Sequence, residues 1–174
     1  LIVKYPERFA AAAVGAGIVN WVSDYGTADI AVTKETEFFG YPWDEEARNI
    51  MIRQSPLTYA GQAKAPTLFI HGEVDQRVPY SEAEQMYVAL KKNGVETKLL
   101  HVAFLLDAPT ASRVATLDPK RSPPDEFVVV GRDVYLRCPN GGGTSKLTNA
   151  YFDAKLATVS TARERSGALP FRRL

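Results

Sequence analysis

The sequence predicts an α/β fold, and three adjacent stretches of its 174 residues carry that prediction. The run APTLFIHGE, residues 65–73, has a β-rich apolar centre and is bounded by Pro66 and Gly72, which is typical of a buried strand. SEAEQMYVALKKNG, residues 81–94, repeats its apolar side chains with helical spacing, and VETKLLHV, residues 95–102, alternates like a strand. Together they predict a strand–helix–strand unit with a right-handed crossover.

The helix predicted over residues 81–94 has recognisable signals at both ends. Ser81 and Glu84 have the spacing of a capping box, in which each side chain accepts from the other's backbone N–H. Gly94 suits the left-handed residue that ends a helix, and two lysines in the last turn complement the helix dipole. The side chains expected on the buried face are Ala83, Met86, Tyr87 and Leu90.

Residues 9–19 form a continuous apolar run before this unit. We predict a buried strand of a parallel sheet there, with a short buried helix as the alternative because alanine favours helices. The run has 11 residues, whereas a transmembrane helix needs about 20, and no charged segment precedes it as in a signal peptide. We therefore expect no membrane span and a cytoplasmic location, and, since the chain begins at Leu1, a truncated N-terminus. Residues 24–43 lack a clear period, so short helical turns are expected there.

After the last of these strands the pattern changes, and a second, smaller α/β portion is predicted. Asp107 can cap a short helix over residues 108–117, and the proline-rich residues 119–126 are expected to form an extended connector. FVVVGRDVYLRC, residues 127–138, has two β-rich stretches with Gly131-Arg132 near the turn between them, which predicts a β-hairpin.

One further helix is predicted near the end of the chain, over residues 145–156. The side chains expected on its apolar face are Leu147, Ala150, Tyr151 and Ala154. The preceding PNGGGTS suggests either a flexible loop or a phosphate-binding loop, and the flexible loop is the better interpretation because the Walker spacing G-x-x-x-x-G-K-[ST] is not met. Residues 164–174 show no period and are expected to be disordered.

Charge is distributed unevenly along the chain. The formal net charge is +1, but residues 1–100 carry −3 and residues 101–174 carry +4. Such a difference suggests two segments of different origin. The near-neutral total argues against a nucleic-acid binder, and Arg132, Arg137 and Lys146 are too sparse to form a basic site.

The cysteine and histidine content limits the metal chemistry. The chain has one cysteine, Cys138, which we interpret as a passive thiol, and two histidines, His71 and His101. An intrachain disulfide and a cysteine-based zinc cluster are therefore excluded. We expect no metal and no other cofactor.

The stretch HGEVDQRVP, residues 71–79, contains the most informative polar residues. A carboxylate directly after a buried strand is well placed to hold a catalytic imidazole in one tautomer, as in a Ser-His-Asp triad. An aspartate that only caps the following turn is the alternative, and the spacing alone does not separate the two.

Five stretches of residues 1–100 carry a resemblance to a known family: YPERFAAAAVGAGIVNW, SDYGTADI, TEFFGYPWDE, SPLTYA and APTLFIHGEVDQRVPYSEAEQMYVALKKNGVETKLL. In this order and spacing they resemble the C-terminal hydrolase domain of the prolyl oligopeptidase family of serine peptidases, on its acylaminoacyl and dipeptidyl peptidase side. The resemblance implies a partial α/β-hydrolase sheet, a triad in the order Ser, Asp, His, and peptide substrates. It also implies that Asp75 is the triad acid, that Arg77, Trp21 and Tyr25 contribute to substrate binding, and that His71 is structural.

Two parts of the family's site are not found in this sequence. A nucleophile elbow of the G-x-S-x-G-G type does not occur, and ETKLL is not followed by the Gly-His-Gly loop that carries the general base; His101 lies too early for that role. The triad acid only orients the base, so we expect a serine-type peptidase by resemblance that is inactive alone. Activity would require a nucleophile and a base from another segment or chain. A non-catalytic interaction module or a non-functional gene fusion is the alternative.

The second portion has a resemblance of its own. HVAFLLDAP, DEFVVVGRDVYLRCPNG and SKLTNAYFDAKLATVSTAR resemble the later half of a small bacterial α/β domain family of unknown function. We therefore expect a junction at Leu100–His101 between two partial domains. The first is a partial hydrolase domain over residues 1–100, and the second is a partial uncharacterised domain over residues 101–163.

Overall fold

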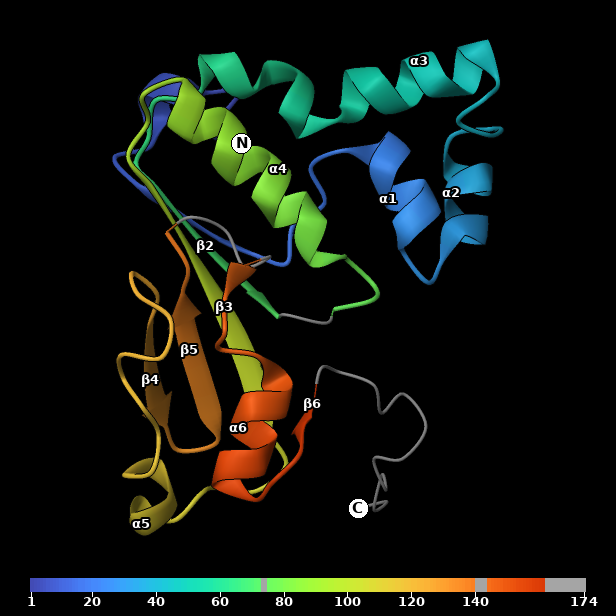
Figure 1. Ribbon diagram of the computed structural model, residues 1–174. Coiled ribbons are helices and arrows are strands. Elements are labelled where there is room, and N and C mark those ends of the chain that lie inside the picture. The colour runs from blue at the N-terminus through green and yellow to red at the C-terminus, as the bar shows by residue number, and fades with distance from the viewer. Residues whose placement is uncertain (73–74, 140–143, 162–174) are drawn as a thin grey trace, which may run out of the picture. The chain divides into compact units, whose positions relative to one another are not determined.

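The computed structural model describes residues 1–72, 75–139 and 144–161 (Figure 1). The chain forms two compact units: unit 1 comprises Leu1–His71 and Asp75–Leu99, and unit 2 contains Gly72 and the described residues from Leu100 onward. Each unit combines strands with helices, which confirms the predicted α/β class. The predictions for residues 140–143 and for the tail over residues 164–174 lie outside the described residues.

Unit 1 contains two short 3₁₀ helices, four α-helices, two strands and the start of a third among its described residues. In chain order these are η1 (Pro6–Arg8), β1 (Ala12–Gly15), α1 (Trp21–Thr27), α2 (Ala31–Glu37), α3 (Glu45–Gln54), η2 (Pro56–Gln62), β2 (Thr67–Gly72), α4 (Tyr80–Lys92) and β3 (Thr97–Leu105), whose last residues belong to unit 2.

The strands of unit 1 neighbour one another in the order β1, β2, β3, with β1 and β2 parallel. α4 connects β2 to β3 and packs on them, because its Met86 and Leu90 cluster with Phe69 of β2 and Leu99 of β3 (Figure 1). The predicted strand–helix–strand unit is confirmed. The short helices α1 and α2 also confirm the expectation for residues 24–43.

β1 corrects the prediction of a buried strand over residues 9–19. The strand is present, but it spans four residues that alternate between half-buried and exposed. β1 is the terminal strand in the order of the described sheet, so it has a strand neighbour on one side only. A terminal position explains why an apolar run does not become a fully buried strand.

α4 corrects the predicted capping box. The helix begins at Tyr80, and its N-cap residue Pro79 makes no side-chain capping bond, so Ser81 already lies inside the first turn. The end of the helix is as predicted, because Gly94 adopts a φ of +75°. Of the expected buried face, Ala83, Met86 and Leu90 are buried and Tyr87 is half-buried; the buried Glu82 was not expected.

The described residues of unit 2 form a small antiparallel arrangement with one main helix. Its elements after β3 are α5 (Ala111–Val114), β4 (Glu126–Val130), β5 (Asp133–Arg137), α6 (Asn149–Leu156) and β6 (Ser160–Thr161). β3 pairs with β5 and β6, and β5 pairs with β4. The hairpin is confirmed, with Gly131 at a φ of +61° in its turn. Phe152 of α6 packs with Val134 and Leu136 on one face of these strands (Figure 1).

Several details of unit 2 differ from the sequence predictions. β3 continues to Leu105, three residues beyond the predicted end, because its last residues pair with β5 and β6. Asp107 does not cap a helix: α5 begins after Thr110 and has four residues. The connector over residues 119–126 is not extended but turned, with the Ser122 hydroxyl donating to Asp125 at 2.7 Å.

α6 begins four residues later than predicted. The Thr148 side chain caps it by accepting from the backbone N–H of Tyr151 at 3.3 Å. Its buried residues are Tyr151, Phe152 and Leu156, whereas Ala150 and Ala154 are exposed, so the predicted apolar face is wrong in part.

In the part of the chain that the structure describes, no helix is long and apolar enough to cross a membrane. Within the same ranges, no group of three or more metal-ligating side chains is present either.

Candidate functional site

The carboxylate of Asp75 closes the turn that follows β2. Its Oδ1 accepts hydrogen bonds from the backbone N–H groups of Arg77 at 3.0 Å and Val78 at 3.1 Å. Among the residues that the structure describes, Oδ2 accepts no hydrogen bond, and the side chain is partly exposed. The alternative of a turn-capping aspartate is therefore realised by one oxygen, and the other oxygen is available to a further donor.

His71 lies on β2 just before this turn and is 2% exposed. Its Nε2 is 2.7 Å from the carbonyl oxygen of Val78. A carbonyl oxygen only accepts, so Nε2 carries the proton and donates. Nδ1 is buried without a hydrogen-bond partner among the described residues. A buried ring with its proton committed to the backbone fits the structural role expected for His71.

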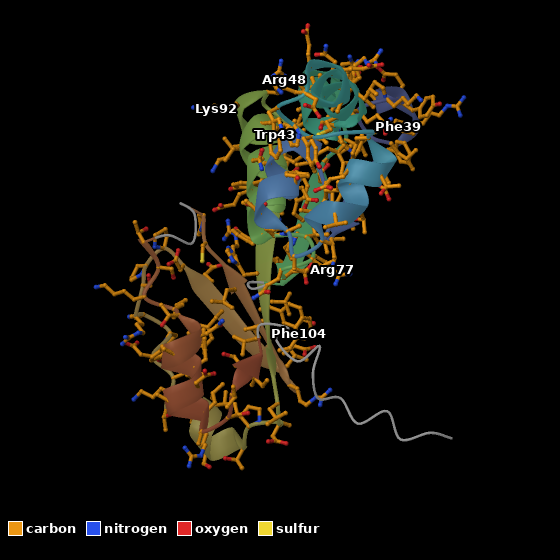
Figure 2. The ribbon with its side chains drawn as sticks, turned by 90° about the vertical axis from the view of Figure 1, so that its right-hand side faces the viewer. Phe39, Trp43, Arg48, Arg77, Lys92 and Phe104 are labelled. Carbon is orange, nitrogen blue, oxygen red and sulfur yellow. The ribbon has the colours of Figure 1, made fainter. Side chains whose placement is uncertain are left out.

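Arg77 points from the same turn to the segment after α1. Its Nε donates to Asp29 Oδ1 at 2.6 Å, and Nη2 lies 3.4 Å from Oδ2. The bond to Arg77 holds the pKa of Asp29 below its usual value, and Asp29 raises the pKa of Arg77. The backbone N–H of Asp29 also donates to the carbonyl of Gln76 at 3.0 Å. The turn and the segment after α1 are therefore joined. The side chain of Arg77, which is labelled in Figure 2, is 57% exposed.

Trp21 and Tyr25 both lie on α1 but contact different aromatic rings. The ring of Trp21 is 5.2 Å from that of Phe38, and the ring of Tyr25 is 5.8 Å from that of Trp43 in an edge-on arrangement. The Tyr25 hydroxyl donates to Glu35 at 2.9 Å; desolvation, and next this bond, raise the pKa of Tyr25. The described contacts thus tie these two residues to α2 and the segment after it, and they tie Arg77 to Asp29.

A buried carboxylate on α4 fixes the start of α1. Glu82 is 0% exposed, and its Oε2 accepts from the backbone N–H groups of Val19 at 3.0 Å and Asn20 at 2.7 Å. Its Oε1 accepts from the Ser23 hydroxyl at 2.5 Å. Four N–H groups at the start of a helix lack backbone partners, and an anion placed there satisfies some of them. Glu82 therefore anchors the helix that carries Trp21 and Tyr25.

A second buried charge cluster joins α1 to α2. Nζ of Lys34 lies 2.7 Å from Oδ2 of Asp24, and the two side chains are 2% and 0% exposed. Burial raises the pKa of Asp24, and the hydrogen bond and charge of Lys34 oppose that rise. Sequence analysis missed Glu82, Asp24 and Lys34, because nothing in their spacing distinguishes them from exposed charges.

Several other features lie outside this arrangement. His101 is in unit 2, 5% exposed in β3 opposite Leu136, so its ring is part of a buried sheet. A shallow depression is lined by five residues of α3 alone, and it contains none of the predicted site residues. Cys138 is buried beside β5, as expected for a passive thiol, and Arg137 pairs with Glu126 at 3.0 Å.

Comparison with known proteins places the sequence of this chain in a family. Residues 1–103 match the family model described as the prolyl oligopeptidase family. The uncharacterized peptidase YuxL of Bacillus subtilis is 40% identical over 99 residues, covering 57% of this chain and 15% of that protein. The acylamino-acid-releasing enzyme of Mus musculus is 35% identical over 106 residues, covering 58% of this chain and 14% of that enzyme.

A solved structure gives the same result for the fold. The acylaminoacyl peptidase of Pyrococcus horikoshii matches with 30% identity and a TM-score of 0.51, over 58% of this chain and 16% of that one. This chain therefore spans about a seventh of the length of the curated relatives that it matches.

Proposed function

The chain belongs to the prolyl oligopeptidase family, and from that premise we propose that residues 1–100 supply the acid member and part of the substrate pocket of a serine-peptidase site. Asp75 is the proposed triad acid. The observation that carries this proposal is the open Oδ2 of a carboxylate whose Oδ1 is fixed by two backbone N–H groups. An acid held in this way can accept from a histidine Nδ1–H without losing its own position.

The proposed substrates are peptides, and three residues are the proposed contacts. Arg77 offers a guanidinium at the turn that carries Asp75, and Trp21 and Tyr25 offer aromatic surface on α1. The Arg77–Asp29 ion pair is exposed, so the guanidinium can exchange Asp29 for a substrate carbonyl at low cost. Triad chemistry uses protein groups only, and the proposal includes no metal or organic cofactor.

We further propose that the 174-residue chain by itself does not perform the covalent step. Its sequence contains no G-x-S-x-G motif, and both of its histidines are buried, at 2% and 5% exposure. The covalent step needs a serine and a histidine whose side chains reach each other and the substrate. These groups would have to come from another segment or chain.

A fluorophosphonate probe, which reacts with activated serines, tests this part of the proposal directly. We expect no site-specific labelling of the purified chain under conditions that label a known serine hydrolase. Labelling that a single serine substitution abolishes would overturn it.

A chimera tests the role of Asp75. Residues 1–99 of this chain would replace the matching segment of the YuxL peptidase, which is 40% identical over 99 residues. If the chimera reacts with the probe, Asp75→Ala should slow labelling by several orders of magnitude, because the acid of a triad contributes about 10⁴-fold. Glu96→Ala, at an exposed carboxylate whose side chain makes no hydrogen bond among the described residues, is the control and should leave the rate unchanged. Equal rates for Asp75→Ala and the unsubstituted chimera would show that Asp75 is not the acid.

The domain organisation is also a proposal. Compact-unit boundaries fall at Leu99 and Leu100, beside the junction expected at Leu100–His101. We propose that residues 101–163 derive from the small bacterial α/β domain family of unknown function, and the order of hairpin and helix in unit 2 supports this. Separate unfolding transitions test the organisation: tryptophan fluorescence, which reports on unit 1, and hydrogen exchange of unit 2 amides should give different midpoints in urea, and one shared midpoint would argue against it.

An interaction module is the second candidate function. β4 is the terminal strand of the described sheet, and its Val128 and Val130 are 54% and 58% exposed. Exposed apolar terminal strands pair readily with other chains. Sedimentation across a concentration series separates the candidates. Association that is kept in Asp75→Ala and lost in Val128→Lys/Val130→Lys supports the module, and a monomer at every concentration argues against it.

A further inference from the structure

His71 and Asp75 hold the same residue from opposite sides. The backbone N–H of Val78 donates to Asp75 Oδ1 at 3.1 Å, and the carbonyl of Val78 accepts from His71 Nε2 at 2.7 Å. The peptide groups of one residue thus link an imidazole on β2 to a carboxylate in the turn. Figure 2 labels Arg77, which lies inside the same turn and donates its backbone N–H to the same Oδ1.

The environment of His71 excludes the role of a general base. The ring is 2% exposed, Nε2 is committed to Val78, and Nδ1 has no hydrogen-bond partner among the described residues. A general base must reach the proton it removes, directly or through one water. Tyr80 also meets the imidazole edge-on, with ring centroids 6.0 Å apart, at the first residue of α4. The ring is therefore fixed between the strand, the turn and the helix.

We propose that His71 is a positioning residue for Asp75. By holding the Val78 carbonyl, it sets the direction of the Val78 N–H and so keeps Oδ1 of Asp75 bonded and Oδ2 open. The relevance of this positioning for peptide hydrolysis rests on the proposed function of Asp75. The positioning itself does not depend on that function, because it acts through backbone groups that are present in the isolated chain.

A matched pair of substitutions separates the hydrogen bond from the bulk of the ring. The side-chain amide of His71→Gln ends near the position of Nε2 and can donate to Val78, whereas His71→Leu fills similar space and cannot donate. The readout is amide hydrogen exchange of Arg77 and Val78 in the full chain, measured relative to the amide of Leu90 in α4. Since Leu90 is 0% exposed, its amide reports loosening of the unit as a whole.

We expect His71→Leu to speed exchange of the Arg77 and Val78 amides about tenfold relative to Leu90, because it leaves the Val78 carbonyl without its donor. His71→Gln should restore exchange to within about threefold of the wild type on the same scale. A constant ratio in His71→Leu, or no restoration by His71→Gln, would overturn the proposal. If the ring only filled space, His71→Gln would lose at least as much protection of the Arg77 and Val78 amides as His71→Leu.

A measurement on the unsubstituted protein covers the case in which His71→Leu does not fold. Long-range ¹H–¹⁵N correlation spectra of the His71 ring report which nitrogen carries the proton. We expect protonated Nε2 and unprotonated Nδ1, and the opposite tautomer would refute the bond to Val78. None of these results depends on peptidase activity. Failure of the probe experiments on Asp75 would therefore reject the proposed function and leave the positioning role of His71 in place. Failure of the exchange and NMR experiments on His71 would reject the positioning role and leave the proposed function in place.

Discussion

Replacing Lys34 by methionine tests how the helical part of unit 1 is held together. Nζ of Lys34 lies 2.7 Å from Oδ2 of Asp24, and both side chains are fully buried. Methionine keeps the apolar stem of lysine and removes the charge, so the Asp24 carboxyl stays buried without its cation. Removing one partner of a buried ion pair costs about 3–5 kcal/mol. We expect the free energy of unfolding of Lys34→Met to fall by about this amount at neutral pH.

The raised pKa of Asp24 makes the loss depend on pH. Burial raises this pKa above its unperturbed value of 3.8 more strongly than the hydrogen bond and charge of Lys34 lower it. An acid with a raised folded-state pKa binds its proton more tightly when folded, so its stabilisation is present below the unfolded pKa and is lost as pH rises through the folded pKa. Without Lys34 the folded pKa rises further. The destabilisation should therefore be largest at neutral pH and shrink as pH falls toward 3.8.

Tryptophan fluorescence during urea denaturation is the assay, because both tryptophans, Trp21 and Trp43, lie in unit 1. The matched control is the double variant Lys34→Met/Asp24→Asn, which removes both charges and should recover more than half of the loss. The reasoning is refuted if Lys34→Met stays within about 1 kcal/mol of the wild type at pH 7. A loss that does not change with pH would refute it equally.

Three further predictions follow from single residues. Gly94→Ala should cost about 1–2 kcal/mol in urea denaturation because φ is +75°, whereas Gly15→Ala, with equally open space and no left-handed φ, should stay within about 0.5 kcal/mol; equal losses would contradict this. Phe152→Ala, at 0% exposure in the core of unit 2, should cost about 3–5 kcal/mol, measured by hydrogen exchange of unit 2 amides, and unchanged protection would contradict it. The Arg77 guanidinium lowers the pKa of Asp29, so in Arg77→Ala this pKa should rise toward 3.8 in a ¹³C NMR titration. The contribution of Asp29 to stability, which the wild type loses as pH falls through the folded-state pKa, should then be absent at every pH. An unmoved pKa would argue against the ion pair in solution.

The fold was predictable where the determining interactions are local. Strand β2, helix α4 and strand β3 follow from alternation, helical spacing and Gly94, all within one continuous stretch. The hairpin follows from two β-rich stretches separated by Gly131 and Arg132. The continuation of β3 to Leu105 was missed because it depends on pairing with β5 and β6, which are distant in the sequence. The helix caps predicted at Ser81 and Asp107 were wrong although they are local, because α4 begins at Tyr80 and α5 begins after Thr110.

The candidate site divides in the same way. The bonds from Arg77 and Val78 to Asp75 are local and are typical of an aspartate in a turn. The buried Glu82 accepts a hydrogen bond from the backbone of Val19, 63 positions away, and Arg77 donates to Asp29, 48 positions away. Charged side chains at such separations resemble solvent-exposed ones in the sequence, because periodicity carries no information on their partners. The family resemblance supplied the roles proposed for Asp75 and Arg77, and these stay predictions.

The order of assembly of the proposed site follows from where its bonds originate. Both bonds to Asp75 Oδ1, the bond from His71 and the pair with Asp29 all come from residues of unit 1. The isolated chain can therefore form the turn that carries Asp75 before any nucleophile or base arrives. If the turn instead needed a partner segment, the Arg77 and Val78 amides would exchange freely in the isolated chain. Slow exchange of these amides in the isolated chain would mean that Asp75 is already in position when a serine and a histidine arrive. Loss of labelling in the Asp75→Ala chimera would then report on the missing carboxylate and not on folding of the turn.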